Sequence, residues 1–240
     1  MDERKSIQVE SFKKCHLSGV FLKGRICSDY LGNLYDFEKI LEYLISLKNG
    51  KGGTGGGDSG GYSGDVDDLG KLEWIKSMKD IVELKPFLKF NDDDDDCSVG
   101  TCQIIDKLTD SVYDIDDFSN NLKFCYLVPC GCVMGLNTLS ELIKIQEKSK
   151  NSGVGSGTFF NMDCPLCGVV FSTRDIININ SIDLNILRDL NKRLEGLKDV
   201  GLSHSLKKIT KKSDKKKSEK KRKIVDVNDD LKINKKVRSL

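Results

Sequence analysis

Hydrophobic residues recur at helical spacing in two separate stretches of this chain. Directly after Asp36, which has the side chain of an N-cap residue, they form one apolar face: Phe37, Ile40, Leu41, Leu44 and Leu47. A later set repeats with three-four-three spacing: Leu187, Leu190, Leu194 and Leu197. This second pattern predicts an amphipathic helix at 181–200. Two heptads are too few for a coiled coil, so the helix either packs on its own domain or binds a partner.

Short apolar runs bounded by glycine and polar residues predict strands. Such runs occur at 20–22, 26–27, 34–35, 124–128 and 169–171. Between the last two, Asn137 can cap a helix that runs from Thr138 to about Glu147. Together these elements predict an α+β fold built from two small units, in each of which two strands precede a helix.

Polar stretches of low complexity divide the chain. Residues 49–71 are rich in Gly, Ser and Asp, residues 91–96 are acidic, and residues 148–158 are rich in Gly. Such stretches bury too little apolar surface to order themselves, so we expect disordered loops there. The expected organisation is an N-terminal unit at 1–48, a flexible insertion at 49–71, an ordered connection at 72–90, an acidic linker at 91–96, a cysteine-bearing unit at 97–180, the amphipathic helix at 181–200 and a disordered basic tail at 201–240.

The net charge of +2 conceals an asymmetry. Residues 207–240 hold 15 Lys/Arg and 5 Asp/Glu, a net of +10, so the rest of the chain carries −8 (2 − 10). Like charges repel, which favours a disordered tail, and His204 at its edge is expected to be exposed. The basic run predicts nuclear localisation, with non-specific contact to nucleic-acid phosphates or a solubilising role as alternatives. The residues of this run are Lys215, Lys216, Lys217, Lys220, Lys221, Arg222 and Lys223.

Two short cysteine pairs carry the clearest chemistry. Cys130-Gly131-Cys132 and Cys164-Pro165-Leu166-Cys167 each form a turn that can supply two thiolates. Zinc prefers four soft ligands on a tetrahedron, with sulfur at about 2.3 Å. The sequence therefore predicts one zinc ion held by Cys130, Cys132, Cys164 and Cys167. Four thiols without a metal are the alternative, because free cysteine often behaves as a small buried hydrophobe.

Other classes of function find less support in the sequence. Nine cysteines without an export signal favour a reducing compartment, and no apolar run approaches the roughly 18 residues of a membrane span. We therefore expect no membrane partner. Phosphate-loop and nucleophile-elbow motifs are absent, and the adjacent Cys15 and His16 lack an orienting acid. No catalytic residue is predicted, and the sequence favours a protein that is not an enzyme.

The spacing of the two cysteine pairs is similar to the second metal site of a RING-type finger. Cys102 stands where such a finger places its first ligand, but Ile105, three residues on, cannot bind metal. The first site is therefore missing, as in U-box domains, and Cys102 and Cys125 are expected to be structural thiols. We interpret residues 97–180 as a degenerate RING-type zinc finger and residues 1–48 as a U-box-like half without a complete ligand set.

Several motifs, in this order along the chain, resemble the replication termination factor 2 family of eukaryotic nuclear proteins. They are Cys15-His16-Leu17-Ser18, Leu31-Gly32-Asn33-Leu34-Tyr35, residues 75–85, Phe124-Cys125-Tyr126-Leu127, the two cysteine pairs and residues 175–180. The chain departs from the family pattern at its first seven residues and at Cys102-Gln103-Ile104-Ile105, where a Cys-Pro-Val-type sequence is usual.

The resemblance implies a nuclear protein that acts at replication forks, where the family promotes fork pausing and termination at barriers. It also implies a scaffold for replisome or other nuclear proteins. A role in pre-mRNA splicing is one alternative. A ubiquitin or SUMO ligase is another, because Ile104 and Pro165 stand where RING and U-box ligases contact the conjugating enzyme. Against the ligase, Gly168 stands near where active ligases often carry a basic residue.

Overall fold

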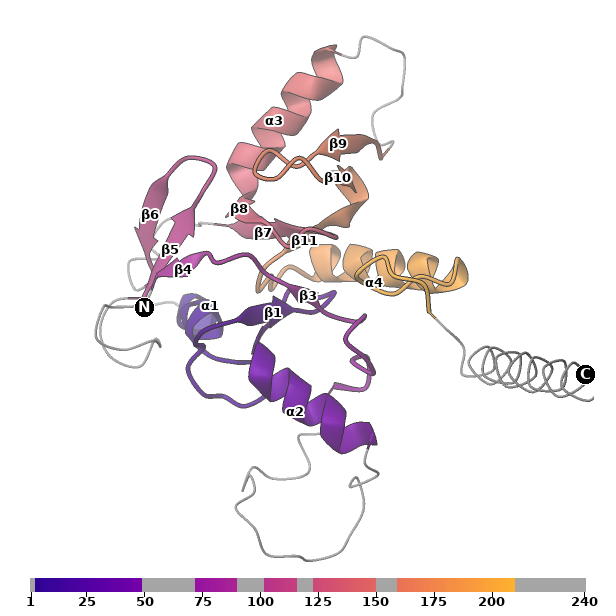
Figure 1. Ribbon diagram of the computed structural model, residues 1–240. Coiled ribbons are helices and arrows are strands. Elements are labelled where there is room, and N and C mark those ends of the chain that lie inside the picture. Colours follow the sequence, from indigo (N-terminus) through magenta and orange to yellow (C-terminus); the bar gives the residue numbers. More distant parts are fainter. Residues whose placement is uncertain (1–2, 49–71, 90–101, 116–122, 150–158, 210–240) are drawn as a thin grey trace, which may run out of the picture. The chain divides into compact units, whose positions relative to one another are not determined.

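The computed structural model describes residues 3–48, 72–89, 102–115, 123–149 and 159–209 (Figure 1). The insertion expected at 49–71, the acidic linker at 91–96 and the basic run at 215–223 lie outside these ranges. The chain divides into two compact units, Met1–Lys207 and Lys208–Leu240. Every helix and strand named below belongs to the first unit.

The first part of the chain forms a small antiparallel sheet followed by a helix. Strand β1 pairs with β2 on one side and with β3 on the other, which gives the order β2-β1-β3. The hairpin leads directly into α2. The elements are α1 (Glu3–Lys13), β1 (Ile26–Ser28), β2 (Leu34–Asp36), α2 (Phe37–Lys48) and β3 (Val82–Glu83).

The second part repeats this arrangement. Strand β7 pairs with β8 and with β11, and the hairpin leads directly into α3. A two-stranded hairpin, β9–β10, and one 3₁₀ turn, η3, lie in the sequence between α3 and β11. The elements are β7 (Phe124–Leu127), β8 (Val133–Gly135), α3 (Leu136–Ser149), β9 (Asn161–Asp163), β10 (Val170–Ser172), η3 (Thr173–Asp175) and β11 (Ile176–Asn178).

A third sheet and a last helix complete the described elements. Strands β4 (Leu88–Lys89), β5 (Gln103–Asp106) and β6 (Ser111–Asp114) pair in that order, and α4 spans Leu184–Asp199. The small sheets and helices confirm a mixed fold of α and β elements. The sequence analysis did not predict α1 or the β5–β6 hairpin.

The three predicted helices exist, with two corrections. The Asp36 carboxylate accepts hydrogen bonds from the amides of Glu38 and Lys39, which confirms it as the cap of α2. The buried face of α2 is Ile40, Tyr43 and Leu44, whereas Leu41 and Leu47 are 40% and 48% exposed, so the expected apolar face was partly wrong. Helix α3 begins at Leu136, ahead of the predicted cap at Asn137, because it continues from β8 without a loop.

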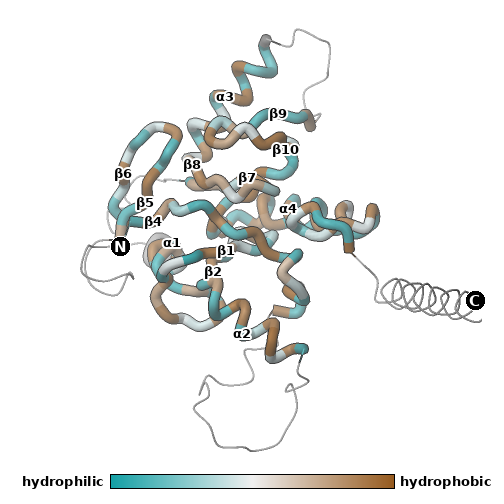
Figure 2. The backbone as a smooth tube through the Cα atoms, viewed as in Figure 1, coloured by the Kyte–Doolittle hydropathy of each residue, from teal (hydrophilic) through white to brown (hydrophobic). Residues whose placement is uncertain are grey.

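The larger of two apolar cores spans both parts of the chain. It contains Leu22, Tyr35 and Ile40 from the first part together with Phe124, Tyr126 and Ile177 from the second. Leu190 of α4 joins this core, so this helix packs on its own domain through one side of its leucine stripe. The tube in Figure 2 alternates between hydrophobic and hydrophilic colours along α3 and α4, as expected for helices with one buried face.

Two glycine turns interlock the two sheets. Gly32 (φ +85) and Gly131 (φ +70) occupy the turns of the β1–β2 and β7–β8 hairpins. A Cβ at Gly32 would overlap the carbonyl oxygen of Asn178, and one at Gly131 would overlap that of Glu83. The carbonyl of each glycine also accepts one bond across the boundary: Asn180 N donates to Gly32 O (3.0 Å), and Lys85 N donates to Gly131 O (2.8 Å).

His204, expected to be exposed, lies in the core with 1% of its surface accessible. Tyr126 Oη donates to the carbonyl of Asp29 (2.5 Å) and lies 2.8 Å from His204 Nε2, while Arg193 Nη1 lies 3.0 Å from His204 Nδ1. Because arginine can only donate, Nδ1 must accept and Nε2 must carry the proton that Tyr126 Oη accepts. This tautomer satisfies every group, and it requires a neutral imidazole.

Gly131→Ala should lower the free energy of unfolding more than an alanine substitution at a glycine that has a similar positive φ but open space at its Cβ position. A positive φ costs an alanine about 1–2 kcal/mol, and at Gly131 the methyl group must also displace the Glu83 backbone. Gly19 (φ +66) has nothing within 4 Å of its Cβ position and provides the control. Denaturant unfolding should show Gly131→Ala losing clearly more free energy of unfolding than Gly19→Ala. Equal losses would contradict the interlock.

Acid should destabilise the protein through His204. Burial first, and the charge of Arg193 second, hold the pKa of His204 well below its usual value of 6.5. In the unfolded chain the imidazole binds a proton as pH falls below about 6.5, and in the folded chain it does not, so this stability is present above pH 6.5 and is lost as pH falls. Between about pH 6.5 and 5 the free energy of unfolding should fall by up to ~1.4 kcal/mol per pH unit.

His204→Asn is the control for this pH dependence. Asparagine can still accept from Arg193, but it does not titrate. The variant should be less stable than the parent at pH 8 and should show a shallower slope of unfolding free energy between pH 6.5 and 5. Parallel slopes for the two proteins would show that His204 takes no part.

Candidate metal centre

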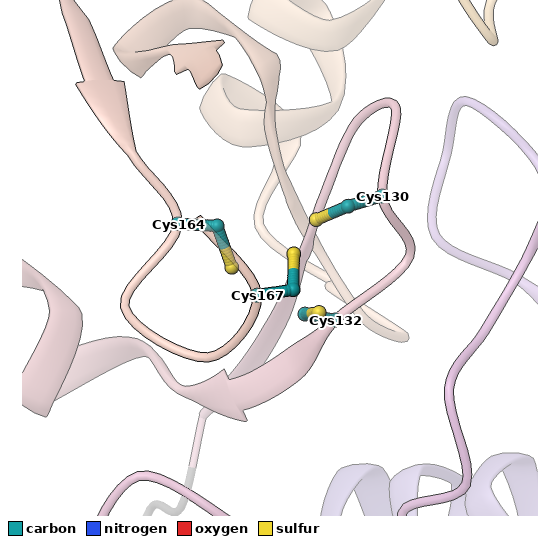
Figure 3. A group of neighbouring side chains, drawn as sticks. All are labelled: Cys130, Cys132, Cys164 and Cys167. Atoms are coloured by element: carbon teal, nitrogen blue, oxygen red, sulfur yellow. The ribbon is translucent and has the colours of Figure 1, made fainter. Parts of the chain in front are cut away.

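Four cysteines from two distant turns meet at one point of the structure. Cys130 and Cys132 lie in the turn between β7 and β8, and Cys164 and Cys167 lie in the turn between β9 and β10. Their sulfur atoms all lie within 4.8 Å of one another and face a common centre in Figure 3. A tetrahedron with metal–sulfur bonds of 2.3 Å has sulfurs about 3.8 Å apart, so this cluster is of the right size. These are the four ligands predicted from the sequence.

Backbone hydrogen bonds shape both turns before any metal is considered. In the first turn, Gly131 N donates to Leu127 O (2.7 Å) and Leu127 N donates to Cys132 O (3.1 Å). In the second, Gly168 N donates to Cys164 O (2.8 Å) and Cys164 N donates to Val169 O (2.9 Å). Gly168 has a φ of +72, which suits glycine. Each turn therefore brings its two thiols close together.

The electrostatics of the cluster favour a cation at its centre. Burial, followed by the neighbouring sulfurs, raises the pKa of Cys130 to about 11, and burial also raises the pKa of Cys132. At Cys167, burial is outweighed by hydrogen bonds from the Val169 amide and the other three thiols, which lower its pKa. Cys130 and Cys132, by contrast, resist ionisation while they have only thiols for neighbours. A divalent ion reverses this, because it stabilises the thiolates by direct coordination. Four sulfur donors with no oxygen donor suit a soft or borderline metal ion.

The turn that carries Cys130 and Cys132, here called the first metal turn, also forms hydrogen bonds with elements outside the cluster. Val128 N donates to Asp175 O (3.0 Å) in η3, and Gly131 O accepts from Lys85 N. The Asp175 carboxylate in turn forms a buried ion pair with Arg193 of α4, with Oδ1 2.8 Å from Nε and 2.7 Å from Nη2. The position of Cys130 and Cys132 thus depends on α4 and on the segment after β3.

The equivalent hairpin turn of the first sheet is closed by a carboxylate instead. Asp29 begins this turn and is fully buried. Its side chain accepts five hydrogen bonds of 2.9–3.0 Å, from Leu31 N, Asn33 N, Asn33 Nδ2, Tyr35 Oη and Trp74 Nε1. A carboxylate with this many donors gathers distant segments around one point much as a metal ion would. Sequence analysis missed Asp29, because nothing in its local sequence marks it.

The segments that precede β3 and β11 are also similar to each other. Ser77-Met78-Lys79-Asp80-Ile81 matches Ser172-Thr173-Arg174-Asp175-Ile176 in sequence pattern. The serine Oγ accepts from the amide two residues on in both, at 3.2 Å from Lys79 N and 3.3 Å from Arg174 N. This short repeat was the signal that could have identified Asp175 from the sequence.

The first part of the chain also contains half of a ligand turn. Gly19 N donates to Cys15 O and Cys15 N donates to Val20 O, both at 2.8 Å, the same bonds that form the Cys164 turn. Ser18 stands where the second turn has Cys167. The Ser18 Oγ is buried and has no hydrogen-bond partner within the part of the chain that the structure describes. In the same described ranges, Cys15 belongs to no group of three or more potential ligands.

The remaining predicted site residues have mixed outcomes. Ile104 is fully buried in β5, which argues against the predicted contact with a conjugating enzyme. Pro165 is exposed on the second metal turn. Cys102 and Cys125 are buried and lie outside the four-sulfur cluster, which confirms them as structural thiols. The basic run at 215–223 lies outside the described residues.

Comparison with known proteins connects this sequence with one family. The family model described as "Rtf2 RING-finger" matches residues 1–239. The chain belongs to the Rtf2 RING-finger family. It is also similar to the protein named splicing factor rtf2 from Schizosaccharomyces pombe, at 28% identity over 225 residues that cover 94% of this chain and 73% of the relative. The family expected from the sequence motifs is thereby confirmed.

Membership of this family agrees with the geometry of the centre. The Rtf2 RING-finger name implies a metal-binding finger, and the four-cysteine cluster provides one complete set of ligands. None of the helices in the described ranges has the length and apolar character needed to cross a membrane.

Metal analysis tests the ligand set. The purified protein should contain about one zinc ion per chain, and Cys164→Ala should abolish that content, because three sulfurs leave an incomplete tetrahedron. Cys102→Ala is the control, since it removes a buried thiol that lies outside the cluster. Elemental analysis after gel filtration measures the zinc. Full zinc content in Cys164→Ala, or loss of zinc in Cys102→Ala, would contradict this assignment.

Proposed function

We propose that the four-cysteine centre binds one zinc ion and that the protein is a nuclear scaffold for protein interactions. The observation that carries the proposal is the convergence of four sulfurs within 4.8 Å of one another. Zinc is the expected ion, because it readily accepts four thiolates in a tetrahedron and such sites are common in intracellular proteins.

The chemistry of the centre supports a structural role for the ion. Catalytic zinc sites keep one position for water or substrate, whereas four protein sulfurs fill the coordination shell. The ion would fasten the β9–β10 hairpin to the turn between β7 and β8. Cys130, Cys132, Cys164 and Cys167 would each contribute a thiolate, and binding would add directly to the stability of this part of the fold.

Pre-mRNA splicing is the process that we put first. The curated relative from Schizosaccharomyces pombe is named a splicing factor, and the alignment covers 94% of this chain. Replication-fork pausing and termination is the second candidate, because the motifs of the chain resemble the replication termination factor 2 family. Both processes take place in the nucleus and both need scaffolds that join other proteins.

The charge distribution supports nuclear localisation in this proposal. Residues 207–240 carry a net charge of +10. A concentration of Lys and Arg of this kind is typical of nuclear-localisation signals and of non-specific contacts with nucleic-acid phosphates. The basic run at 215–223 is the segment that we assign to nuclear import.

A ligase role has less support from the structure. One of the two residues expected to contact a conjugating enzyme, Ile104, is fully buried. Pro165 is exposed, and Val169 and Val170 beside it are 41% and 57% exposed, so the second metal turn offers an apolar surface to some partner. We assign this surface to scaffold partners in general.

Co-purification from nuclei separates the two processes. Tagged protein should bring down spliceosomal proteins in preference to replication-fork proteins, and Cys164→Ala should lose most of this set because the zinc-dependent surface is disturbed. Cys102→Ala, which keeps the centre, should retain it. Quantitative mass spectrometry gives the readout. Enrichment of fork proteins alone would move the assignment to replication, and an unchanged set in Cys164→Ala would separate the partners from the metal centre.

A further inference from the structure

Residues 201–207, the segment after α4, pack against the rest of the first compact unit. We call this segment the strap. Ser205 donates from both its amide and its Oγ to Lys79 O, at 3.1 and 2.8 Å, and Ser203 N donates to Lys207 O (2.9 Å). Ser203, His204 and Ser205 are all buried. The strap therefore holds the end of α4 against the segment that precedes β3.

One chain of contacts leads from the metal turn to the strap through α4. Val128, two residues before Cys130, donates its amide to Asp175 O. The Asp175 carboxylate pairs with Arg193, and Arg193 then donates from Nη1 to His204 Nδ1 (3.0 Å) and from Nη2 to His204 O (3.4 Å). Arg193 is only 3% exposed, so its buried charge is stabilised by these partners and not by water.

A second chain reaches the same histidine through the sheet. Tyr126 lies at the end of β7, next to Leu127, whose amide and carbonyl close the metal turn. Its hydroxyl contacts His204 Nε2 at 2.8 Å and donates to Asp29 O. Both ring nitrogens of His204 are therefore bonded. Nδ1 is bonded to Arg193 of α4, which reaches the metal turn through Asp175, and Nε2 is bonded to Tyr126 of β7.

The buried polar groups of this network are expected to open together and not one at a time. A buried arginine or histidine that loses one partner bears the cost of an unsatisfied group, so partial opening is less favourable than opening the whole network. Low local polarity also makes each hydrogen bond in the network strengthen its neighbours. A change in the metal turn that moves Val128 or Tyr126 is thus transmitted to His204.

We propose that the strap is a latch whose closure is coupled to occupancy of the four-cysteine centre. This inference rests on the proposed binding of zinc there. With the ion bound, the turn around Cys130 is fixed, Asp175 and Tyr126 are held in place, and the strap is closed. Without the ion the turn loosens, the network opens and the strap is released.

Hydrogen exchange measures the latch directly. In zinc-loaded protein the amides of Ser205 and Leu206 should be protected, because they donate to Lys79 O and Ser203 O. Removal of zinc by a chelator should speed their exchange at least about tenfold, within the range of 5- to 150-fold typical of coupled sites. The Leu44 amide of α2 serves as the internal reference and should change much less. Unchanged exchange at Ser205 and Leu206 after complete zinc loss would overturn the latch.

Coupling must act in both directions, which gives a second test that does not require zinc-free protein. Arg193→Lys keeps the charge but loses the planar fork that serves both Asp175 and His204. It should lower the affinity for zinc roughly tenfold, measured at equilibrium in competition with a chromophoric chelator. His204→Asn, which keeps the acceptor for Arg193 but loses the donor to Tyr126, should also bind zinc more weakly.

Arg188→Lys is the matched control on the same helix. Arg188 is exposed and bonds only to Asn185 among the contacts described, so its replacement should leave the zinc affinity unchanged. Parental zinc affinities in both Arg193→Lys and His204→Asn would overturn the latch while leaving the zinc site intact. A parent protein that contains no zinc by elemental analysis would instead overturn the proposed function, and the latch with it.

Discussion

The two small sheets share one core, and the rest of the structure depends on that constraint. A unit as small as one three-stranded sheet with one helix buries little apolar surface by itself. Here residues of both sheets enter one shared cluster, with Phe12 packed edge-on against Phe124 at a centroid distance of 6.4 Å. The glycine turns at Gly32 and Gly131 allow the backbones to approach closely enough for this sharing. The two parts are therefore neither independent domains nor a finger with an appendage.

The β7–β8 and β1–β2 hairpin turns are held in place in two different ways. Each must hold a turn, a following strand and a distant segment around a single point. The β7–β8 turn does so with two cysteines and a partner turn that supplies two more, which is a complete set of ligands for a metal ion. The β1–β2 turn does so with the five hydrogen bonds accepted by Asp29, including one from Trp74 Nε1 at 2.9 Å. The carboxylate needs no ion, so its turn does not depend on metal supply.

Helix α4 and the strap connect the parts of the chain that contain these two turns. Helix α4 and the strap contact the part with the four cysteines through Asp175 and Tyr126. They contact the part with Asp29 through Lys79 O and, via Tyr126, through Asp29 O. Arg193 and His204 form the centre of this contact, and both are buried. In a protein proposed to act as a scaffold, such a connection lets the state of one surface influence another. It also explains why His204 belongs to the body rather than to the basic tail.

The sequence by itself determined the features that depend on neighbouring residues. The spacing after Asp36 predicted α2 and its cap, and the two cysteine pairs predicted the ligand set, because turns and helices are governed by contacts within a few residues. Only the tertiary structure decided which side chains are buried. Tyr126 and Asp29 are 97 residues apart, and Tyr126 and His204 are 78 apart, so no local pattern could pair them. Ile104 and His204 were misplaced for the same physical reason, since burial is set by the segments that pack against a residue and not by its neighbours in the chain.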